Sequence, residues 1–311
     1  MTVKNIAYLG PRGTFTEAAL LQLATAKDAH LIPFETVTAV LDAVRNGEVD
    51  AALVPLENSV EGSVSQTLDE LASGEPLVII DEVAINVKFS LMARPGTKLE
   101  DVTLITTHPH AFAQCRGWLS TALPDARVVP ALSTASAAEE VSDPASRYQA
   151  AIGAEIAATH YGLKVLAHEI GDNSTARTRF VLVTRPTTPP EMTGADRTTL
   201  VVFMHEDHAG ALLEILTEFS VRGVNLTRLE SRPTQKQLGD YYFSIDCEGH
   251  ISEQRVGEAL KGLHRICAEV RYLGSYPRHD GVIPTMHAGM SDVQFKDSDS
   301  WLSNIRKSGK S

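Results

Sequence analysis

The stretch NIAYLGPRGTFTEAALLQLATA, residues 5–26, determines the fold class expected for the first half of this chain. It begins with a short apolar run that is typical of a buried strand, and Gly10 and Pro11 end that strand. Thr14 can then cap a helix through EAALLQLATA, because its hydroxyl can accept a backbone N–H of the first helical turn. A strand that turns directly into a helix is the repeating unit of α/β folds.

The same alternation continues along the chain. Residues 30–35 are typical of a strand, and residues 37–47 carry apolar side chains at helical spacing. Residues 50–58 predict a buried strand, and residues 63–74 predict a helix that begins at a serine. This order predicts a domain with a largely parallel sheet.

The pattern changes at residues 76–96, a stretch too long for one ordinary strand and without a helical period. We interpret it as a crossing between two lobes, because a second strand–helix series follows over residues 103–162. A single helix is expected over 111–122, and a strand at 164–170 leads back to the first lobe. Two α/β lobes joined by crossing strands leave a cleft, which is a common place for a small ligand.

The last third of the chain has a different organisation. Residues 186–197 are rich in Pro and Thr and predict a linker. Residues 198–277 show the βαββαβ order of a ferredoxin-like domain. Residues 278–311 have few apolar side chains and predict a disordered tail.

Composition excludes several classes of protein. The formal net charge of −11 over 311 residues argues against general nucleic-acid binding, which needs clustered Lys and Arg. Cys115, Cys247 and Cys267 form no CxxC pair, which favours reduced thiols over disulfides or a zinc site. The N-terminus lacks a secretory signal, and no apolar run approaches the ~20 residues of a membrane helix. We therefore expect a cytoplasmic protein that contacts no membrane.

Polar segments follow two strands of the first lobe. In the turn after the first strand, Gly13 permits close approach of an anion to a helix N-terminus, although a plain βα turn needs the same residues. Glu57, Asn58 and Ser59 lie at the carboxyl end of a strand, where open α/β folds bind ligands. A turn with an Asn or Ser cap is the alternative for these three.

A third polar segment follows a strand of the second lobe. Thr107 and Gln114 could face the same cleft, and Pro109 fits the first turn of a helix. His108 and His110 flank that proline, but without a nearby Cys or acidic ligand they indicate capping or exposed residues rather than a metal site.

Five motifs in this order and spacing resemble those of the prephenate dehydratase family: YLGPRGTFTEAA, VPLENSVEGSVSQTLDEL, THPHAFAQC, STASAA and TRF. The resemblance covers roughly residues 4–277, and GALL (210–213) and ESRP (230–233) resemble an ACT regulatory domain. It implies a two-lobed, periplasmic-binding-protein-like catalytic domain followed by a ferredoxin-like ACT domain. The implied boundaries are 1–185 for the catalytic domain (lobe 1 about 1–81 and 167–185, lobe 2 about 82–166), 186–197 for the linker, 198–277 for the ACT domain and 278–311 for the tail.

The resemblance implies a carbon–oxygen lyase that converts prephenate to phenylpyruvate in phenylalanine biosynthesis. Loss of carbon dioxide and of a ring hydroxyl makes the ring aromatic, so no cofactor, metal or covalent nucleophile is required. The enzyme has to hold a dianion and stabilise the departing hydroxide, which suits hydroxyls, amides and arginines.

Within this family pattern, Thr178 is the expected catalytic hydrogen-bond donor. Glu57 is a general acid only if burial raises its pKa, and otherwise an orienting or structural residue. The substrate-binding residues implied are Pro11, Gly13, Thr14, Asn58, Ser59, Thr107, Gln114, Arg179 and Phe180. The family usually has Ser at the position of Thr107; Arg179 could instead hold the loop, and Phe180 could simply pack.

In the C-terminal domain, the apolar spacing of Leu212, Ile215 and Phe219 predicts the core face of a helix. The resemblance implies a phenylalanine site between the ACT domains of two subunits, and hence a homodimer or homotetramer regulated by phenylalanine. Its implied residues are Gly210, Ala211, Leu212, Leu213, Asn225, Leu226, Thr227, Glu230, Ser231 and Arg232.

Two other functions remain open from the sequence. The two lobes and the ACT domain would also suit a non-catalytic sensor of small anions or amino acids. The same chemistry on arogenate is a nearer alternative, and the amino group of arogenate would need an acidic partner in the cleft.

Overall fold

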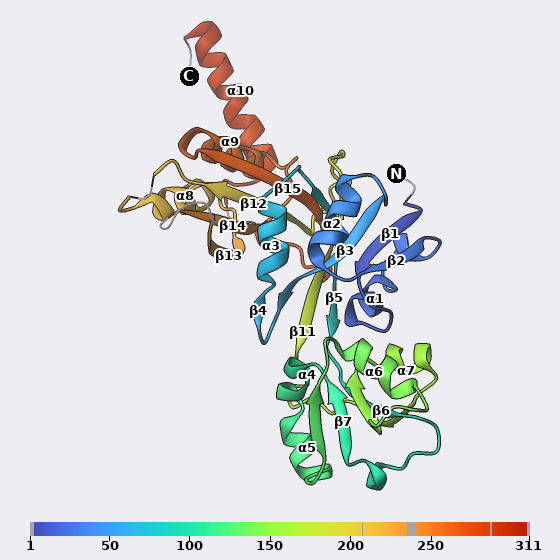
Figure 1. Ribbon diagram of the computed structural model, residues 1–311. Helices are drawn as coiled ribbons and strands as arrows, with labels where there is room; N and C mark the ends of the chain where they lie inside the picture. Colours follow the sequence, from blue (N-terminus) through green and yellow to red (C-terminus); the bar gives the residue numbers. More distant parts are fainter. Residues whose placement is uncertain (1–2, 207, 235–239, 287, 310–311) are drawn as a thin grey trace. The chain divides into compact units, whose positions relative to one another are not determined.

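The computed structural model divides the chain into two compact units (Figure 1). The first unit comprises Met1–Glu70 and Val83–Val183, and the second comprises Leu71–Glu82 and Thr184–Ser311. The structure describes residues 3–206, 208–234, 240–286 and 288–309.

The first sheet contains the strand–helix units expected from the N-terminal sequence. Its elements are β1 (Asn5–Leu9), α1 (Phe15–Leu20), β2 (His30–Phe34), α2 (Val37–Arg45), β3 (Ala51–Asn58), β4 (Gly62–Ser63), α3 (Ser65–Ala72), β5 (Val78–Asn86) and β11 (Arg177–Thr184). The strand order is β2-β1-β3-β11-β5, with β4 paired to β3, and β1 is parallel to β2 and β3. β5 and β11 are the crossing strands, so the sheet ends on the segments that lead to the second lobe.

The second lobe is built on a separate five-stranded sheet. Its elements are β6 (Ser90–Ala93), β7 (Leu104–Thr107), α4 (Pro109–Gln114), α5 (Arg116–Ala122), β8 (Arg127–Pro130), α6 (Thr134–Ser142), β9 (Ala150–Gly153), α7 (Glu155–Tyr161) and β10 (Lys164–Ala167). The order is β10-β6-β9-β7-β8. Leu91 and Met92, adjacent on β6, enter two different core clusters, so helices cover both faces of this sheet.

Two helices differ from the sequence prediction. The helix expected over 111–122 is interrupted at Cys115, whose φ of −118° and ψ of 8° are not helical. The helix after Thr14 ends at Leu20, where Leu23 N–H bonds to the Leu20 carbonyl and tightens the chain into the short 3₁₀ turn Ala24–Ala26. Apolar spacing runs through both breaks, so periodicity alone does not reveal them.

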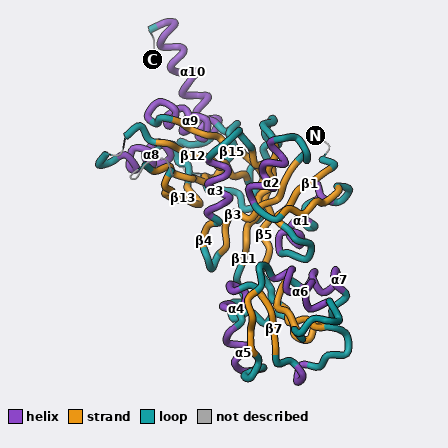
Figure 2. The backbone as a smooth tube through the Cα atoms, in the orientation of Figure 1, coloured by secondary structure: helices purple, strands orange, loops and turns teal. Residues whose placement is uncertain are grey.

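The second unit has the βαββαβ order that the sequence predicts, and the tube in Figure 2 shows its helices and strands by type. Its elements are β12 (Asp196–Phe203), α8 (Ala211–Ser220), β13 (Leu226–Pro233), β14 (Tyr241–Glu248), α9 (Gln254–Ile266) and β15 (Glu269–Pro277). The sheet order is β13-β14-β12-β15, and the three pairs are antiparallel. Ile215 and Phe219 are buried as expected, whereas Leu212 is exposed, so the buried stripe of α8 is narrower than predicted.

The segment 278–311 contains a helix where the sequence analysis expects disorder. α10 spans Asp292–Ser308, with a reciprocal cap between Ser291 and Gln294 and a left-handed Gly309 at its end. The N–H of Gln254 donates to Asp292 Oδ1 at 2.9 Å, which joins α10 to α9. Helix start and stop signals therefore outweigh the polar composition here; residues 287, 310 and 311 lie outside the described residues.

Membrane insertion by a helix is not indicated for the described part of the chain, since none of its helices combines the length and apolarity that a span requires.

Candidate active site

Asn58 and Thr178 form the central contact of the candidate site. Asn58 Nδ2 donates to Thr178 Oγ1 at 2.8 Å, while Asn58 Oδ1 accepts the N–H groups of Val60 (2.8 Å) and Glu61 (3.0 Å). Because the amide oxygen takes two backbone donors, the amide NH₂ has to face the threonine. Thr178 Oγ1 is thus an acceptor in this pair, and within the described chain its own O–H has no acceptor.

The neighbouring positions form two further links between the same strands. Arg179 Nη2 lies 3.1 Å from Glu57 Oε2, and the Glu57 side chain is 42% exposed. The Ser59 N–H donates to the Arg177 carbonyl, and the Ser59 hydroxyl accepts the Arg177 N–H, both at 2.9 Å. Successive side chains of a strand point to opposite faces, so Glu57 and Arg179 lie on the face opposite to Asn58 and Thr178.

Glu61, which is not among the residues expected at the site from the sequence, links this cluster to the second lobe. Gln114 Nε2 donates to Glu61 Oε1 at 3.2 Å, and His110 Nδ1 lies 2.8 Å from Glu61 Oε2. Asn58 holds the Glu61 backbone N–H, so one network contains Asn58, Thr178 and Gln114. The acidic Glu61 in ENSVEGS (57–63) was the available signal in the sequence. No neighbouring residue indicated that its side chain would contact α4.

The hydroxyl of Thr107 is committed to the fold. Thr107 is fully buried, and its Oγ1 donates to the Ile152 carbonyl at 2.7 Å, which ties β7 to β9. Phe180 is buried in the sheet and packs, which is one of the two roles considered for it.

The turn after β1 satisfies its own donors. Gly13 N–H donates to Glu17 Oε2 at 2.6 Å, and Thr14 Oγ1 accepts the Glu17 N–H and donates to the Leu9 carbonyl. A Cβ on Gly13 would lie 2.9 Å from Ala157 Cβ, so this glycine permits close approach of the two lobes. Pro11 follows Gly10 through a cis peptide bond in the same turn. The carboxylate of Glu17 therefore occupies the helix N-terminus that the sequence analysis considered for an external anion.

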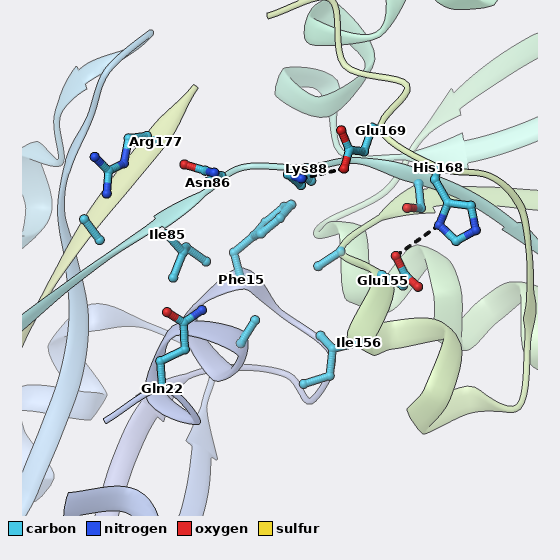
Figure 3. Close-up of a pocket in the computed structure, with 14 residues that line it drawn as sticks. Phe15, Gln22, Ile85, Asn86, Lys88, Glu155, Ile156, His168, Glu169 and Arg177 are labelled. Carbon is cyan, nitrogen blue, oxygen red and sulfur yellow. Dashed lines mark hydrogen bonds and ion pairs between the residues drawn. The ribbon is translucent and has the colours of Figure 1, made fainter. Parts of the chain in front are cut away.

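A cavity of about 480 Å³ lies between the lobes, on the side of β11 that carries Arg177 (Figure 3). Phe15 lies near its centre, with Asn86 and Arg177 toward one end and the ion pairs Lys88–Glu169 (2.5 Å) and His168–Glu155 (3.2 Å) toward the other. Neither Thr178 nor Asn58 lines it. Since adjacent residues of a strand face opposite ways, this cavity is separate from the Asn58–Thr178 contact.

The two histidines have capping and pairing roles. His108 caps α4, with its Nδ1 accepting the His110 N–H at 3.3 Å, and Pro109 occupies the first helical position as predicted. Burial lowers the pKa of His108, the nearby His110 lowers it further, and Glu61 opposes both. Across the described ranges, no group of three or more His, Cys, Asp or Glu side chains is placed to hold a metal ion.

The fold defines a class of protein: a two-lobed α/β unit with hydrogen-bonding groups gathered at strand ends, joined to a ferredoxin-like unit. Comparison with known proteins identifies the family. The family model for prephenate dehydratase matches residues 6–188, and the model for the ACT domain matches residues 198–265. The chain belongs to the prephenate dehydratase family, whose members are carbon–oxygen lyases, as the motifs predicted.

Individual relatives agree over nearly the whole chain. Prephenate dehydratase of Amycolatopsis methanolica is 47% identical over 306 residues, covering 98% of this chain and 99% of the relative. The crystal structure of prephenate dehydratase in complex with L-Phe from Arthrobacter aurescens is 51% identical, with a TM-score of 0.93 over 97% of this chain and 99% of that one. A structure described as a quorum quenching acylase is 31% identical, with a TM-score of 0.79 over 88% of this chain and 98% of that one.

The cap on α4 predicts a pH effect. Since the pKa of folded His108 lies below its ordinary value of about 6.5, its contribution to stability is present above that pH and lost as the pH falls through the folded pKa. Protonation of Nδ1 also removes the cap acceptor. Asn can cap the helix at any pH. We therefore expect the free energy of unfolding of His108→Asn, relative to that of the wild type, to be about 1 kcal/mol higher at pH 5 than at pH 7.5. Urea unfolding at both pH values measures this difference, and parallel pH profiles for the two proteins would refute it.

Proposed function

We propose that this chain converts prephenate to phenylpyruvate and that the Thr178 hydroxyl is its catalytic hydrogen-bond donor. The observation that carries the proposal is the direction of the Asn58–Thr178 hydrogen bond. Asn58 is the donor, so the threonine O–H is left for another acceptor. A departing hydroxyl oxygen is such an acceptor.

The reaction breaks two bonds in the substrate. The electron pair of the ring–carboxylate bond moves into the ring as carbon dioxide leaves, and the ring C–O bond breaks with its electrons on oxygen. That oxygen takes a proton and leaves as water. A hydrogen bond from Thr178 stabilises the negative charge that develops on it, as an oxyanion-hole donor does. Asn58 keeps the threonine in place, so little reorganisation is needed at the moment of reaction.

The other residues of the network position the substrate or the lobes. We assign Asn58 and Gln114 to the substrate, because both are amides in the network that joins β3 to α4. Glu57 and Arg179 pair with each other, which supports an orienting role for Glu57. Ser59 joins β3 to β11 beside Asn58, whereas the contacts described for Pro11, Gly13, Thr14, Thr107 and Phe180 support a structural role.

The charges near Thr178 favour prephenate over arogenate. The amino group of arogenate would need a carboxylate, but Glu57 pairs with Arg179, and Glu61 pairs with His110 and Gln114. Turnover itself would exclude a non-catalytic sensor. Purified protein should therefore form phenylpyruvate from prephenate much faster than it forms phenylalanine from arogenate.

We expect Thr178→Val to lower kcat on prephenate about 10²-fold or more, by analogy with the loss of one oxyanion donor. Thr178→Ser keeps the hydroxyl and should retain most of the activity. Phenylpyruvate formation measures both variants, and circular dichroism checks that the fold is intact. Near-normal turnover by the valine variant would remove Thr178 from the catalytic role.

L-Phenylalanine is proposed as the regulatory ligand of the second unit. The Arthrobacter aurescens structure is a complex with L-Phe. In this chain, Glu230 Oε2 on β13 is buried and has no hydrogen-bond partner among the described residues. A buried carboxylate oxygen without a donor is costly, and the ammonium of an amino acid would satisfy it.

The remaining residues expected at this site lie on α8 and β13. Gly210 adopts a left-handed φ of 100° at the start of α8, followed by Ala211. Asn225 and Leu226 line a cavity of about 390 Å³ in the second unit. The other proposed contacts lie on the same two elements: Leu212 and Leu213 on α8, and Thr227, Ser231 and Arg232 on β13.

Glu230→Gln should weaken L-phenylalanine binding about tenfold, because a hydrogen bond to a charged group is worth roughly 1.5–3 kcal/mol. Isothermal titration measures the Kd. 3-Phenylpropanoate, which lacks the ammonium, is the control ligand and should bind both proteins equally. An equal loss for both ligands would mean that Glu230 does not recognise the amino group.

We propose that a second copy of the chain covers the edge of the second unit's sheet. β13 is an edge strand, and Leu213 on α8 is 66% exposed. Exposed strand edges and apolar side chains are typically covered in stable proteins. Sedimentation should show a dimer or tetramer that Leu213→Glu dissociates, whereas Leu132→Glu, at a 96% exposed position of the first unit, leaves it intact. A monomeric wild type would contradict this assignment.

A cytoplasmic location is proposed from the thiols. Cys115, Cys247 and Cys267 are free and buried. Burial raises the pKa of Cys115 and Cys247 to about 12 and that of Cys267 to about 11. Such unpaired thiols suit a reducing compartment.

A further inference from the structure

Strand β5 belongs to both compact units. Residues up to Glu82 group with the second unit, and residues from Val83 group with the first. The boundary residue is a carboxylate whose side chain is fully buried. Charged side chains are almost never fully buried unless they are paired, so the partners of Glu82 are informative.

Both oxygens of Glu82 are held by the second unit. Arg197 Nη1, at the start of β12, donates to Oε2 at 2.5 Å. His279, just after β15, donates its backbone N–H to Oε1 at 3.1 Å and places its Nδ1 2.9 Å from the same atom. Replacing a buried ion pair by apolar side chains often costs no stability. A carboxylate that accepts hydrogen bonds on both oxygens, however, fixes the geometry of its partners, which apolar side chains do not.

A second contact fixes the same end of β5. Gly274 on β15 has a φ of 134°, and a Cβ at this position would lie 2.2 Å from the Ile79 carbonyl oxygen. The backbones of β15 and β5 therefore meet without a side chain between them. The first half of β5 is anchored at Ile79 and at Glu82.

The other half of β5 runs beside the strand that carries Thr178. β5 neighbours β11 in the first sheet, and just beyond its end the Val87 N–H donates to the Ala176 carbonyl at 2.8 Å. Ala176 lies two residues before Thr178. A shift of β5 along its own axis would therefore reach the Thr178 backbone through sheet hydrogen bonds.

We propose that Glu82 is a positioning residue through which the conformation of the second unit sets the position of Thr178. This inference rests on the proposed function, in which phenylalanine binds the second unit. A ligand can change catalysis at a distance only if an element has two arrangements that both sites bias. β5 is the element that this structure offers, with Arg197 and His279 as its anchor.

Glu82→Gln tests the proposal because it keeps the size of the side chain and removes its charge. Amide hydrogen exchange in the ligand-free protein should rise at residues 83–87 and 176–178, at least several-fold. His279→Ala, which removes the imidazole contact but keeps the backbone N–H bond and the Arg197 pair, should show a smaller rise at the same residues. Glu253→Gln breaks another buried pair of the second unit, Glu253–Arg255. The further hydrogen bonds of that pair are to His250 and Gly223 rather than to β5, so this variant should leave these amides unchanged.

A second measurement tests the coupling to phenylalanine. In Glu82→Gln, the factor by which saturating L-phenylalanine lowers kcat/KM should fall at least fivefold, while its Kd stays within about twofold; coupling factors of 5–150 are typical. Glu253→Gln should keep the wild-type factor.

The two measurements have separate outcomes. Unchanged exchange at 176–178 in both Glu82→Gln and His279→Ala would overturn the positioning role. A wild type that binds phenylalanine without any change in turnover would overturn the proposed regulation, while the exchange data would still decide the role of Glu82. If exchange at residues 176–178 rises equally in Glu253→Gln, the effect of Glu82 is a general loss of stability and the positioning role is wrong.

Discussion

The hydrogen bonds that join the ends of β3 and β11 are the constraint on which the candidate active site depends. Asn58 and Thr178 are 120 residues apart in sequence, and only the pairing of these strands brings them to 2.8 Å. Two backbone N–H groups occupy the amide oxygen of Asn58, so its NH₂ has to point to the threonine. One lone pair of the Thr178 oxygen is thereby occupied, and its O–H points away from Asn58 toward another acceptor.

Alternation along the same strands separates the charged side chains from the hydroxyl of Thr178. Glu57 and Arg179 pair on one face, while Asn58 and Thr178 meet on the other. The carboxylates of Glu57 and Glu61 are already paired, so the side chain that donates to Thr178 is an uncharged amide. Dipoles of this kind can stabilise developing charge without carrying an ion that must first be desolvated.

The division of β5 between two compact units is the basis of the regulation proposed above, which needs no long relay of side chains. Arg197 and His279 donate hydrogen bonds to Glu82 on β5, and just beyond the other end of the strand Val87 bonds to Ala176, close to Thr178. β5 is the edge strand of the first sheet, so its ladder with β11 is the connection through which it acts on Thr178. Because the hydrogen bonds to the buried Glu82 carboxylate are charge-assisted, they fix the position of β5 more specifically than apolar contacts would.

Local signals in the sequence were sufficient for much of this protein. Strand and helix periodicity, the cap at Thr14, Pro109 at the start of α4 and the order of the second unit depend on residues close together in the chain. Ordered motifs were likewise sufficient for the family. Only the tertiary structure decided which polar groups remain available. The Thr107 hydroxyl bonds to the Ile152 carbonyl, the Gly13 N–H bonds to Glu17, and Glu61 binds Gln114 on a different lobe. The reason is that a hydrogen-bonding group is available only when no other part of the folded chain already uses it, and Thr107, Glu61 and Thr178 have partners 45 to 120 residues away.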